Sequence, residues 1–123
     1  MQLIEWKVAL AQAAYDAAAG ISIARLTGDD GFATYLAEIA PGKSVRPHYH
    51  KAGDEHYHIV GGAGEIRLAS VDGGPKRAMR VAAGVSFVVP ANTIHELINT
   101  GDTILVWMFS CAASHLTDDR CLL

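Results

Sequence analysis

Residues 42–62 read GKSVRPHYHKAGDEHYHIVGG and contain three of the four side chains that decide the fold and the chemistry. His48 and His50 are two positions apart, so on an extended chain both imidazoles point to the same side. Glu55 follows a short loop at residues 51–54 and begins the next apolar stretch. If that side is the interior, these three groups can share one metal ion.

A second stretch, residues 84–99, reads GVSFVVPANTIHELIN and supplies His95, about 40 residues after Glu55. Imidazole and carboxylate ligands together suit Fe, Mn, Ni, Co, Cu or Zn as divalent ions. Three nitrogens and one carboxylate fill four positions of an octahedron and leave two open for water, substrate or oxygen. We therefore predict one divalent transition metal ion, of unassigned identity, on these four side chains.

Outward from these stretches, short apolar segments alternate with turns rich in Gly, Asn, Asp and Pro. Such spacing predicts an all-β sandwich, barrel or jelly roll. The Gly-rich residues 61–64 open no helical pattern, so we interpret them as a hairpin turn and not as a phosphate loop. The predicted strands are residues 21–26, 32–40, 46–50, 55–60, 65–71, 77–81, 85–89, 94–98 and 103–110.

The first twenty residues are ambiguous. Ile4, Val8, Ala11 and Tyr15 recur at helical spacing, yet residues 4–8 also alternate as a strand would. We favour an extended start followed by a short Ala-rich helix that ends at Gly20.

Composition limits the classes of protein that need to be considered. The 123 residues suffice for one domain, residues 1–123, and half of them are apolar. A net charge of -3 argues against a nucleic-acid partner, and no apolar run reaches the ~20 residues of a membrane span. Residues 8–20 lack the cationic leader of a signal peptide. The two cysteines, Cys111 and Cys121, form no Cys-x-x-Cys pair, which favours a reducing cytoplasm.

The two stretches resemble the paired motifs of the cupin family. Residues 42–62 match G-x5-H-x-H-x4-E-x6-G, and residues 84–99 match G-x5-P-x-G-x2-H-x3-N except at Asn92, where the family usually has Gly. Asn tolerates the left-handed backbone of a tight turn, so the departure is mild. The resemblance implies a conical jelly-roll β-barrel with a short N-terminal helix. It also implies that His48, His50, Glu55 and His95 are the metal ligands.

Two predicted strands, residues 85–89 and 104–109, are apolar on both faces. A half-exposed strand alternates, so the outer faces of these two need a cover. A second subunit would provide it, and small single-domain cupins commonly pair; we therefore predict a homodimer. The rival explanation is that the N-terminal helix covers one of these faces.

The remaining histidines are assigned no part in the site. Alternation from Glu55 turns His56 and His58 outward, to the surface or a dimer interface. His115 lies in a polar tail with Asp118, Asp119 and Arg120, and we treat it as structural, although a tail can fold across a barrel mouth.

Fold and ligands do not select a reaction, so three hypotheses stand. The first is a non-redox isomerase, epimerase or lyase acting on a small oxygenated or sugar-like substrate. Its catalytic candidates are Tyr57 and Tyr35 as the base that moves a proton, and Arg46 to hold a carboxylate or phosphate. The second is an Fe(II)-dependent dioxygenase. The third is a non-enzymatic module that binds or senses a small molecule.

Overall fold

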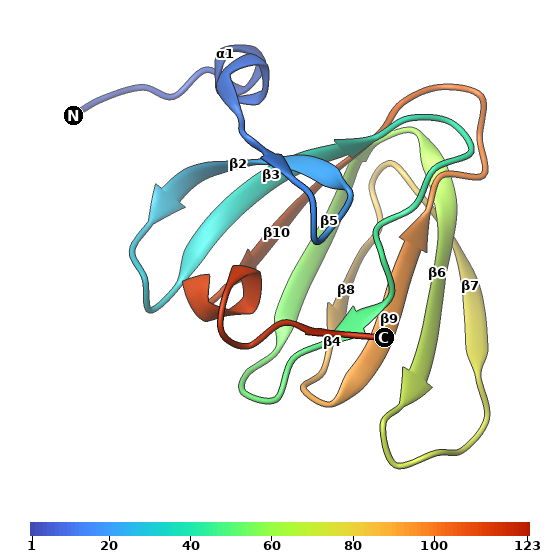
Figure 1. The fold of residues 1–123 in the computed structure, drawn as a ribbon. Helices are drawn as coiled ribbons and strands as arrows, with labels where there is room; N and C mark the ends of the chain where they lie inside the picture. Colours follow the sequence, from blue (N-terminus) through green and yellow to red (C-terminus); the bar gives the residue numbers. More distant parts are fainter.

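Two antiparallel sheets face each other in the computed structural model, which describes residues 1–123 (Figure 1). The strand order is β1-β2-β3-β10-β5-β8 in the six-stranded sheet and β11-β4-β9-β6-β7 in the five-stranded sheet. The strands are β1 Tyr15–Asp16, β2 Ile21–Gly28, β3 Ala33–Ile39, β4 His48–Tyr49, β5 Glu55–Gly61, β6 Ala63–Ser70, β7 Arg77–Ala82, β8 Ser86–Val89, β9 Thr93–Ile98, β10 Leu105–Cys111 and β11 Cys121–Leu122. The predicted all-β architecture is thereby confirmed.

The core lies between the sheets because the strands alternate as their sequences predict. Along β5 and β10 every second side chain is buried, and Tyr57, Ile59, Trp107 and Phe109 therefore face the interior. These residues belong to one cluster of 18 buried residues drawn from both sheets. Burial of this apolar surface is the main stabilising contribution to the fold.

Two turns show how the motifs fit the backbone. Asn92 has φ 58° and is the only residue other than glycine with a positive φ, as its motif position predicts. Gly62 has φ 82°, and a Cβ added there would lie 2.6 Å from the carbonyl oxygen of Ile104.

The prediction of a hairpin at residues 61–64 is wrong. β5 and β6 lie in different sheets, so the chain crosses from one sheet to the other at this corner.

Asn99 closes the second motif by joining β9 to its neighbours. Its buried Nδ2 donates to the carbonyl oxygens of Ile39 and Thr103, each at 2.8 Å, and its Oδ1 accepts from the Gly101 amide at 2.9 Å. A buried amide whose hydrogen bonds are satisfied in this way fixes the turn after β9.

The N-terminal helix is shorter than predicted. α1 spans Trp6–Gln12, packs against β2 and β3, and has no buried residue. It does not continue to Gly20, because Asp16 pairs with Ile21 and its Oδ1 accepts hydrogen bonds from the amides of Ala18 and Ala19. That side chain folds residues 16–20 into a turn. Neither α1 nor the short η1 has the length and apolar character needed to cross a membrane.

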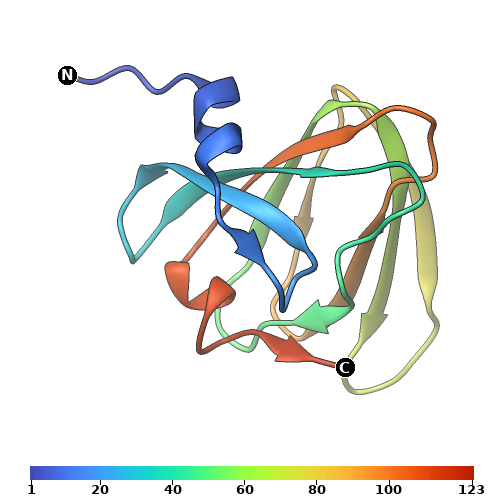
Figure 2. The ribbon, with the colours of Figure 1, turned by 45° about the horizontal axis from the view of Figure 1, so that its top comes forward.

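Residues 112–123 form a C-terminal strap that connects the two sheets. The strap leaves β10 of the six-stranded sheet, forms the 3-10 helix η1 (Ala113–Leu116), and ends with β11 paired to β4 of the five-stranded sheet. Figure 2 shows it in red beside β4, at the end of the sheets where the two predicted motifs meet.

Candidate metal centre

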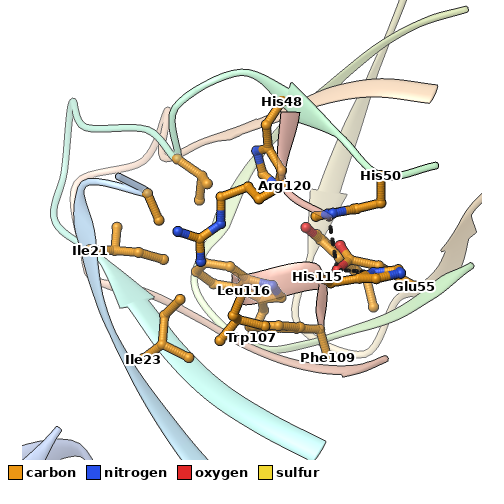
Figure 3. A pocket seen from close by; sticks show the side chains of 13 residues that line it. Ile21, Ile23, His48, His50, Glu55, Trp107, Phe109, His115, Leu116 and Arg120 are labelled. Atoms are coloured by element: carbon orange, nitrogen blue, oxygen red, sulfur yellow. Dashed lines mark hydrogen bonds and ion pairs between the residues drawn. The ribbon is translucent and has the colours of Figure 1, made fainter. Parts of the chain in front are cut away.

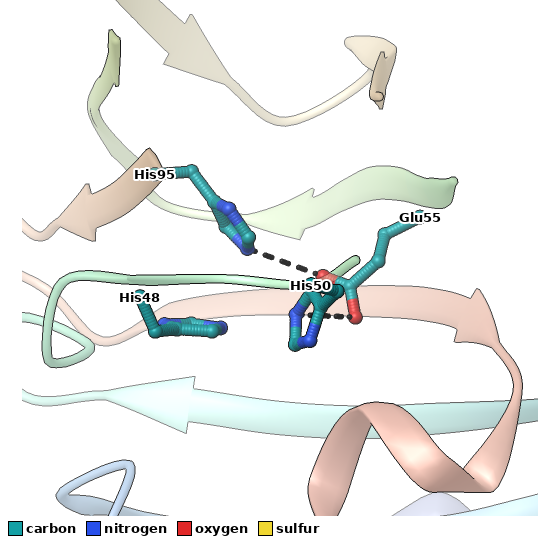
Figure 4. A group of neighbouring side chains, drawn as sticks. All are labelled: His48, His50, Glu55 and His95. Atoms are coloured by element: carbon teal, nitrogen blue, oxygen red, sulfur yellow. Dashed lines mark ion pairs between the residues drawn. The ribbon is translucent and has the colours of Figure 1, made fainter. Parts of the chain in front are cut away.

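The four predicted ligands converge inside the protein (Figure 4). His48 lies on β4 and pairs directly with His95 on β9, His50 follows β4, and Glu55 is the first residue of β5. Their exposed fractions are between 1% and 7%. One potential ligand atom from each lies within 4.8 Å of all the others. This group can hold a metal ion.

Backbone carbonyls fix the tautomer of each histidine. The Nδ1–H groups of His48, His50 and His95 donate to the carbonyl oxygens of Arg46, Asp119 and Thr93, at 2.7, 2.5 and 2.9 Å. A carbonyl oxygen can only accept, so Nδ1 carries the proton in all three rings. In its neutral form each ring therefore has its lone pair on Nε2, the usual arrangement of a metal-binding histidine.

The surroundings of the Nε2 atoms suit a bound cation better than a hydrogen bond to another group of the protein. Those of His50 and His95 are buried without a hydrogen-bond partner. They lie 3.2 and 3.3 Å from Oε2 and Oε1 of Glu55, close but poorly aligned for a hydrogen bond. Lone pairs on nitrogen and on a carboxylate repel each other unless a proton or a metal ion lies between them. The donor set of three imidazoles and one carboxylate therefore fits a divalent transition metal.

The electrostatics keep the ligands ready to bind. Burial lowers the pKa of His48 to about 4, and the neighbouring His95 acts in the same direction, so the ring is neutral at pH 7. Burial alone would raise the pKa of Glu55. The hydrogen bond from His115 and the proximity of His50 and His95 outweigh it and hold that pKa well below its usual range. The carboxylate is therefore ionised.

His115, expected to be structural, contacts the site directly. Its ring is buried, with Nδ1 2.9 Å from Oε2 of Glu55 and Nε2 2.6 Å from the carbonyl oxygen of Ala52. Both partners accept, so the ring donates from both nitrogens as an imidazolium. Burial opposes this charge, but the bonds to Glu55 and Ala52 prevail and raise the pKa of His115. His115 thereby orients the carboxylate, whose Oε2 also faces His50 and whose Oε1 faces His95.

The strap is attached to the ligand loop at several points. The Asp119 carboxylate accepts from the amides of Lys51 and Ala52 at 2.7 and 2.9 Å, while its carbonyl oxygen accepts from His50. Arg120 donates to both carboxylate oxygens of Asp16, at 2.9 and 2.6 Å. The strap is thus joined both to the loop that carries His50 and to β1.

A narrow pocket opens beside the ligands (Figure 3). His48, His50, Glu55 and His115 line it, together with Arg120 and a set of apolar side chains, Ala19, Ile21, Ile23, Val45, Tyr57, Trp107, Phe109 and Leu116. The free space is about 20 Å³, enough for one water molecule. The Nε1 atom of Trp107 is buried and has no hydrogen-bond partner.

The predicted catalytic residues occupy three different environments. Tyr57 is buried and lines the pocket. Tyr35 is buried but does not line it, because it stacks on Phe109 with 5.1 Å between ring centroids. Arg46 is exposed and also lies outside the pocket lining, where Arg120 occurs instead. His56 and His58 are exposed, as alternation predicts.

A second group, Glu55, Cys111 and His115, also brings potential ligand atoms within 4.8 Å of one another. It is a poorer metal site, because both ring nitrogens of His115 already have partners. Burial also raises the pKa of Cys111, and the nearby Glu55 adds to the shift, so the thiol keeps its proton.

Sequence reasoning missed four residues: Asp16, His115, Asp119 and Arg120. The available signal was weak. The polar residues at 115–120 contain a histidine, two aspartates and an arginine within an otherwise apolar C-terminal region. Such a cluster usually indicates an exposed tail, and only the path of the strap across the ligand loop gives it a function.

Comparison with known proteins agrees with this geometry. The sequence pattern of the cupin domain family matches residues 35–111, which include all four ligands. No curated protein is similar enough in sequence to count as a match.

Solved structures share the fold at low sequence identity. The capsular polysaccharide assembling protein CapF from Staphylococcus aureus aligns with TM-score 0.74 and 21% identity, over 84% of this chain and 32% of CapF. An oxalate oxidase gives TM-score 0.73 and 22% identity over 94% of this chain and 61% of the oxidase. A variant of oxalate decarboxylase from Bacillus subtilis gives 0.70 and 21% over 84% and 28%. The chain thus spans about a third of CapF, and these likenesses establish the jelly-roll fold.

Proposed function

Because the chain belongs to the cupin family, we propose that it is a divalent-metal-dependent enzyme acting on a small oxygenated molecule by non-redox, isomerase-, epimerase- or lyase-like chemistry. The observation that carries this proposal is the common state of the three histidines. Each commits Nδ1 to a carbonyl oxygen and presents Nε2 toward the cluster that contains Glu55.

The roles of the residues follow from their positions. His48, His50, Glu55 and His95 would hold the ion. When bound, a divalent ion supplies a Lewis acid that polarises a carbonyl or hydroxyl group. His115 keeps Glu55 oriented, and the apolar wall of the pocket limits the entry of water.

Tyr57 is the residue we assign to proton movement, although as a donor and not as the base. Burial and the nearby Glu55 carboxylate raise its pKa well above 10, so the hydroxyl keeps its proton at pH 7. A protonated phenol beside the ligands can donate a hydrogen bond or a proton to a developing oxyanion. A Tyr57→Phe variant should bind metal normally and lose turnover.

Metal analysis of the protein purified from its native host without added metals tests the proposal. We expect one divalent ion per chain. Iron, together with oxygen uptake during turnover, would move the assignment to the dioxygenase. A protein that takes up no divalent ion after dialysis against zinc, manganese, nickel or iron would contradict both.

We also propose that the protein is a cytoplasmic homodimer. Val60 and Val88 are 42% and 47% exposed on the outer face of the six-stranded sheet, and α1 packs on β2 and β3, away from β8. The helix therefore leaves the outer face of β8 uncovered. Sedimentation should give twice the chain mass, and Val88→Asp should reduce it to one chain. Both cysteines are free, as in a reducing compartment.

A further inference from the structure

The Trp107 indole nitrogen is a buried donor that the metal centre does not explain. The side chain is 1% exposed and lines the pocket with the ligands, yet Nε1 has no hydrogen-bond partner. A metal ion on the four proposed ligands would account for the other two unpartnered buried atoms, Nε2 of His50 and of His95. An indole N–H can only donate, and leaving it unpaired in an apolar site is unfavourable. The pocket is thus built for an acceptor that is not part of the chain.

Arg120 brings further donors to the same pocket. Its side chain is only 8% exposed, and the two hydrogen bonds to Asp16 use two of its five N–H groups. Asp16 also fixes the direction of the guanidinium, because both carboxylate oxygens are engaged. Three N–H groups therefore remain for a ligand.

The charges around the pocket select the sign of this ligand. A divalent ion brings two positive charges and Arg120 brings one, whereas the carboxylates of Glu55 and Asp16 remove one each. The loaded pocket keeps a positive charge. The rest of the lining is His48, His50, His115, Tyr57, Trp107 and aliphatic or phenyl side chains, and none of these carries a negative charge. A neutral or cationic molecule would leave this charge and these donors uncompensated.

We propose that the pocket binds a small carboxylate, whose oxygens accept hydrogen bonds from Trp107 Nε1 and the Arg120 guanidinium beside the metal. The proposal rests on the metal-dependent function and names its substrate class. Because the free space of about 20 Å³ has room for one water molecule, even a small carboxylate has to widen the pocket at its lining.

Formate is the smallest carboxylate and the natural probe, with formamide as its neutral counterpart of similar shape. The chain has two tryptophans, so ¹H–¹⁵N spectra of the zinc-loaded protein contain two indole signals. Trp6 on α1 is half exposed and serves as the internal reference. We expect formate to shift the Trp107 signal saturably and leave Trp6 unchanged. Formamide should bind at least about tenfold more weakly, as expected for losing a charge-assisted hydrogen bond.

Three substitutions and one control at an exposed arginine separate recognition from loosening of the strap. Arg120→Gln should weaken formate binding at least about tenfold by calorimetry, whereas Arg46→Gln, at an exposed position, should change it less than about twofold. Asp16→Asn weakens the anchor of the strap but keeps the guanidinium and one acceptor oxygen for it, so it should lose less formate affinity than Arg120→Gln. Trp107→Phe keeps the ring and the zinc and should bind formate about tenfold more weakly.

Each result decides between two claims. A protein that takes up no zinc overturns the proposed function and this inference together. A zinc-loaded protein whose Trp107 signal ignores formate, or that binds formamide equally well, overturns the carboxylate proposal alone. The same holds if Asp16→Asn loses as much formate affinity as Arg120→Gln, because the guanidinium would then act only as a tether.

Discussion

The candidate metal site is assembled from two regions that differ in how their sequence encodes structure. The ligand region consists of β4, the start of β5 and β9, and its side chains are placed by strand alternation and by the pairing of His48 with His95. The C-terminal strap has one short 3-10 turn and a two-residue strand, and hydrogen bonds hold its side chains in place. Both regions contact the Glu55 carboxylate. The ligand region does so through His50 and His95, and the strap does so through His115.

This difference indicates that the ligand region and the strap contribute to the site in different ways. The ligand region determines whether an ion binds, because it provides the lone pairs. The strap determines how firmly Glu55 is held and how much space remains in the pocket, since it contributes His115, Leu116 and Arg120 to the lining. Damage to the first region should abolish binding, and damage to the second should weaken binding or stability by degrees.

The largest effect is expected from the ligand region. His95→Ala removes a ligand and should reduce zinc affinity by more than the roughly 100-fold that losing a partner outside the ligand set can cost. Elemental analysis after gel filtration should find an unloaded chain whose circular dichroism remains that of a β protein. His56→Ala, at an exposed position on β5, should keep one zinc per chain. Full occupancy in the His95 variant would contradict the assignment.

The next effect tests the contact between the strap and the ligands. His115→Leu removes the donor to Oε2 of Glu55 and should weaken zinc binding about 10- to 100-fold, measured by competition with a chromogenic chelator. The control is His58→Leu, whose ring bonds only Ser86 Oγ at the surface. If the His115 variant instead binds zinc more tightly, loss of a nearby positive charge outweighs loss of orientation, and the positioning role is wrong.

A smaller effect concerns the anchor of the strap. Asp16→Asn weakens the pair with Arg120 and should lower the free energy of unfolding by about 1–3 kcal/mol in urea titrations. The matched variant Asp30→Asn disturbs the exposed pair with Arg25 and should cost less than about 1 kcal/mol. Equal losses in the two variants would show that the strap is no more firmly held than an ordinary surface pair.

The smallest effect is the pH dependence of the metal-free protein. The unfolded chain protonates His48 below pH 6.5, whereas the folded chain does so only near pH 4, so the stability it contributes is complete above pH 6.5 and lost as pH falls toward 4. Between pH 7 and pH 6 this amounts to about 0.7 kcal/mol. His48→Gln should flatten the unfolding profile by that amount, and His56→Gln should not. Parallel profiles for His48→Gln and the wild type would exclude the effect.

The sequence allowed the ligand region to be predicted because its information is local. A period of two determines which side of a strand His48, His50 and Tyr57 face, and turn residues such as Gly62 and Asn92 report a backbone conformation directly. The ends of most strands fall within two residues of their predicted positions for the same reason.

The strap could not be predicted, because its contacts join residues far apart in the chain. Arg120 finds Asp16 across 104 positions, and His115 finds Glu55 across 60. The local sequence pattern does not identify a distant partner for such a residue. A polar segment is therefore predicted to be exposed. The length of α1 was missed for a related reason. The Asp16 side chain bonds the amides that a longer helix would have used.

The allocation of ligands between sheets has a mechanical consequence. His48 and His95 belong to the five-stranded sheet and Glu55 to the six-stranded sheet, so an ion bound to all three would cross-link the two sheets. The layers could then separate only by releasing the ion. Resistance to unfolding should therefore rise by about 1.4 kcal/mol for each tenfold increase in free metal above the dissociation constant. Melting temperature would report metal availability without any knowledge of the substrate.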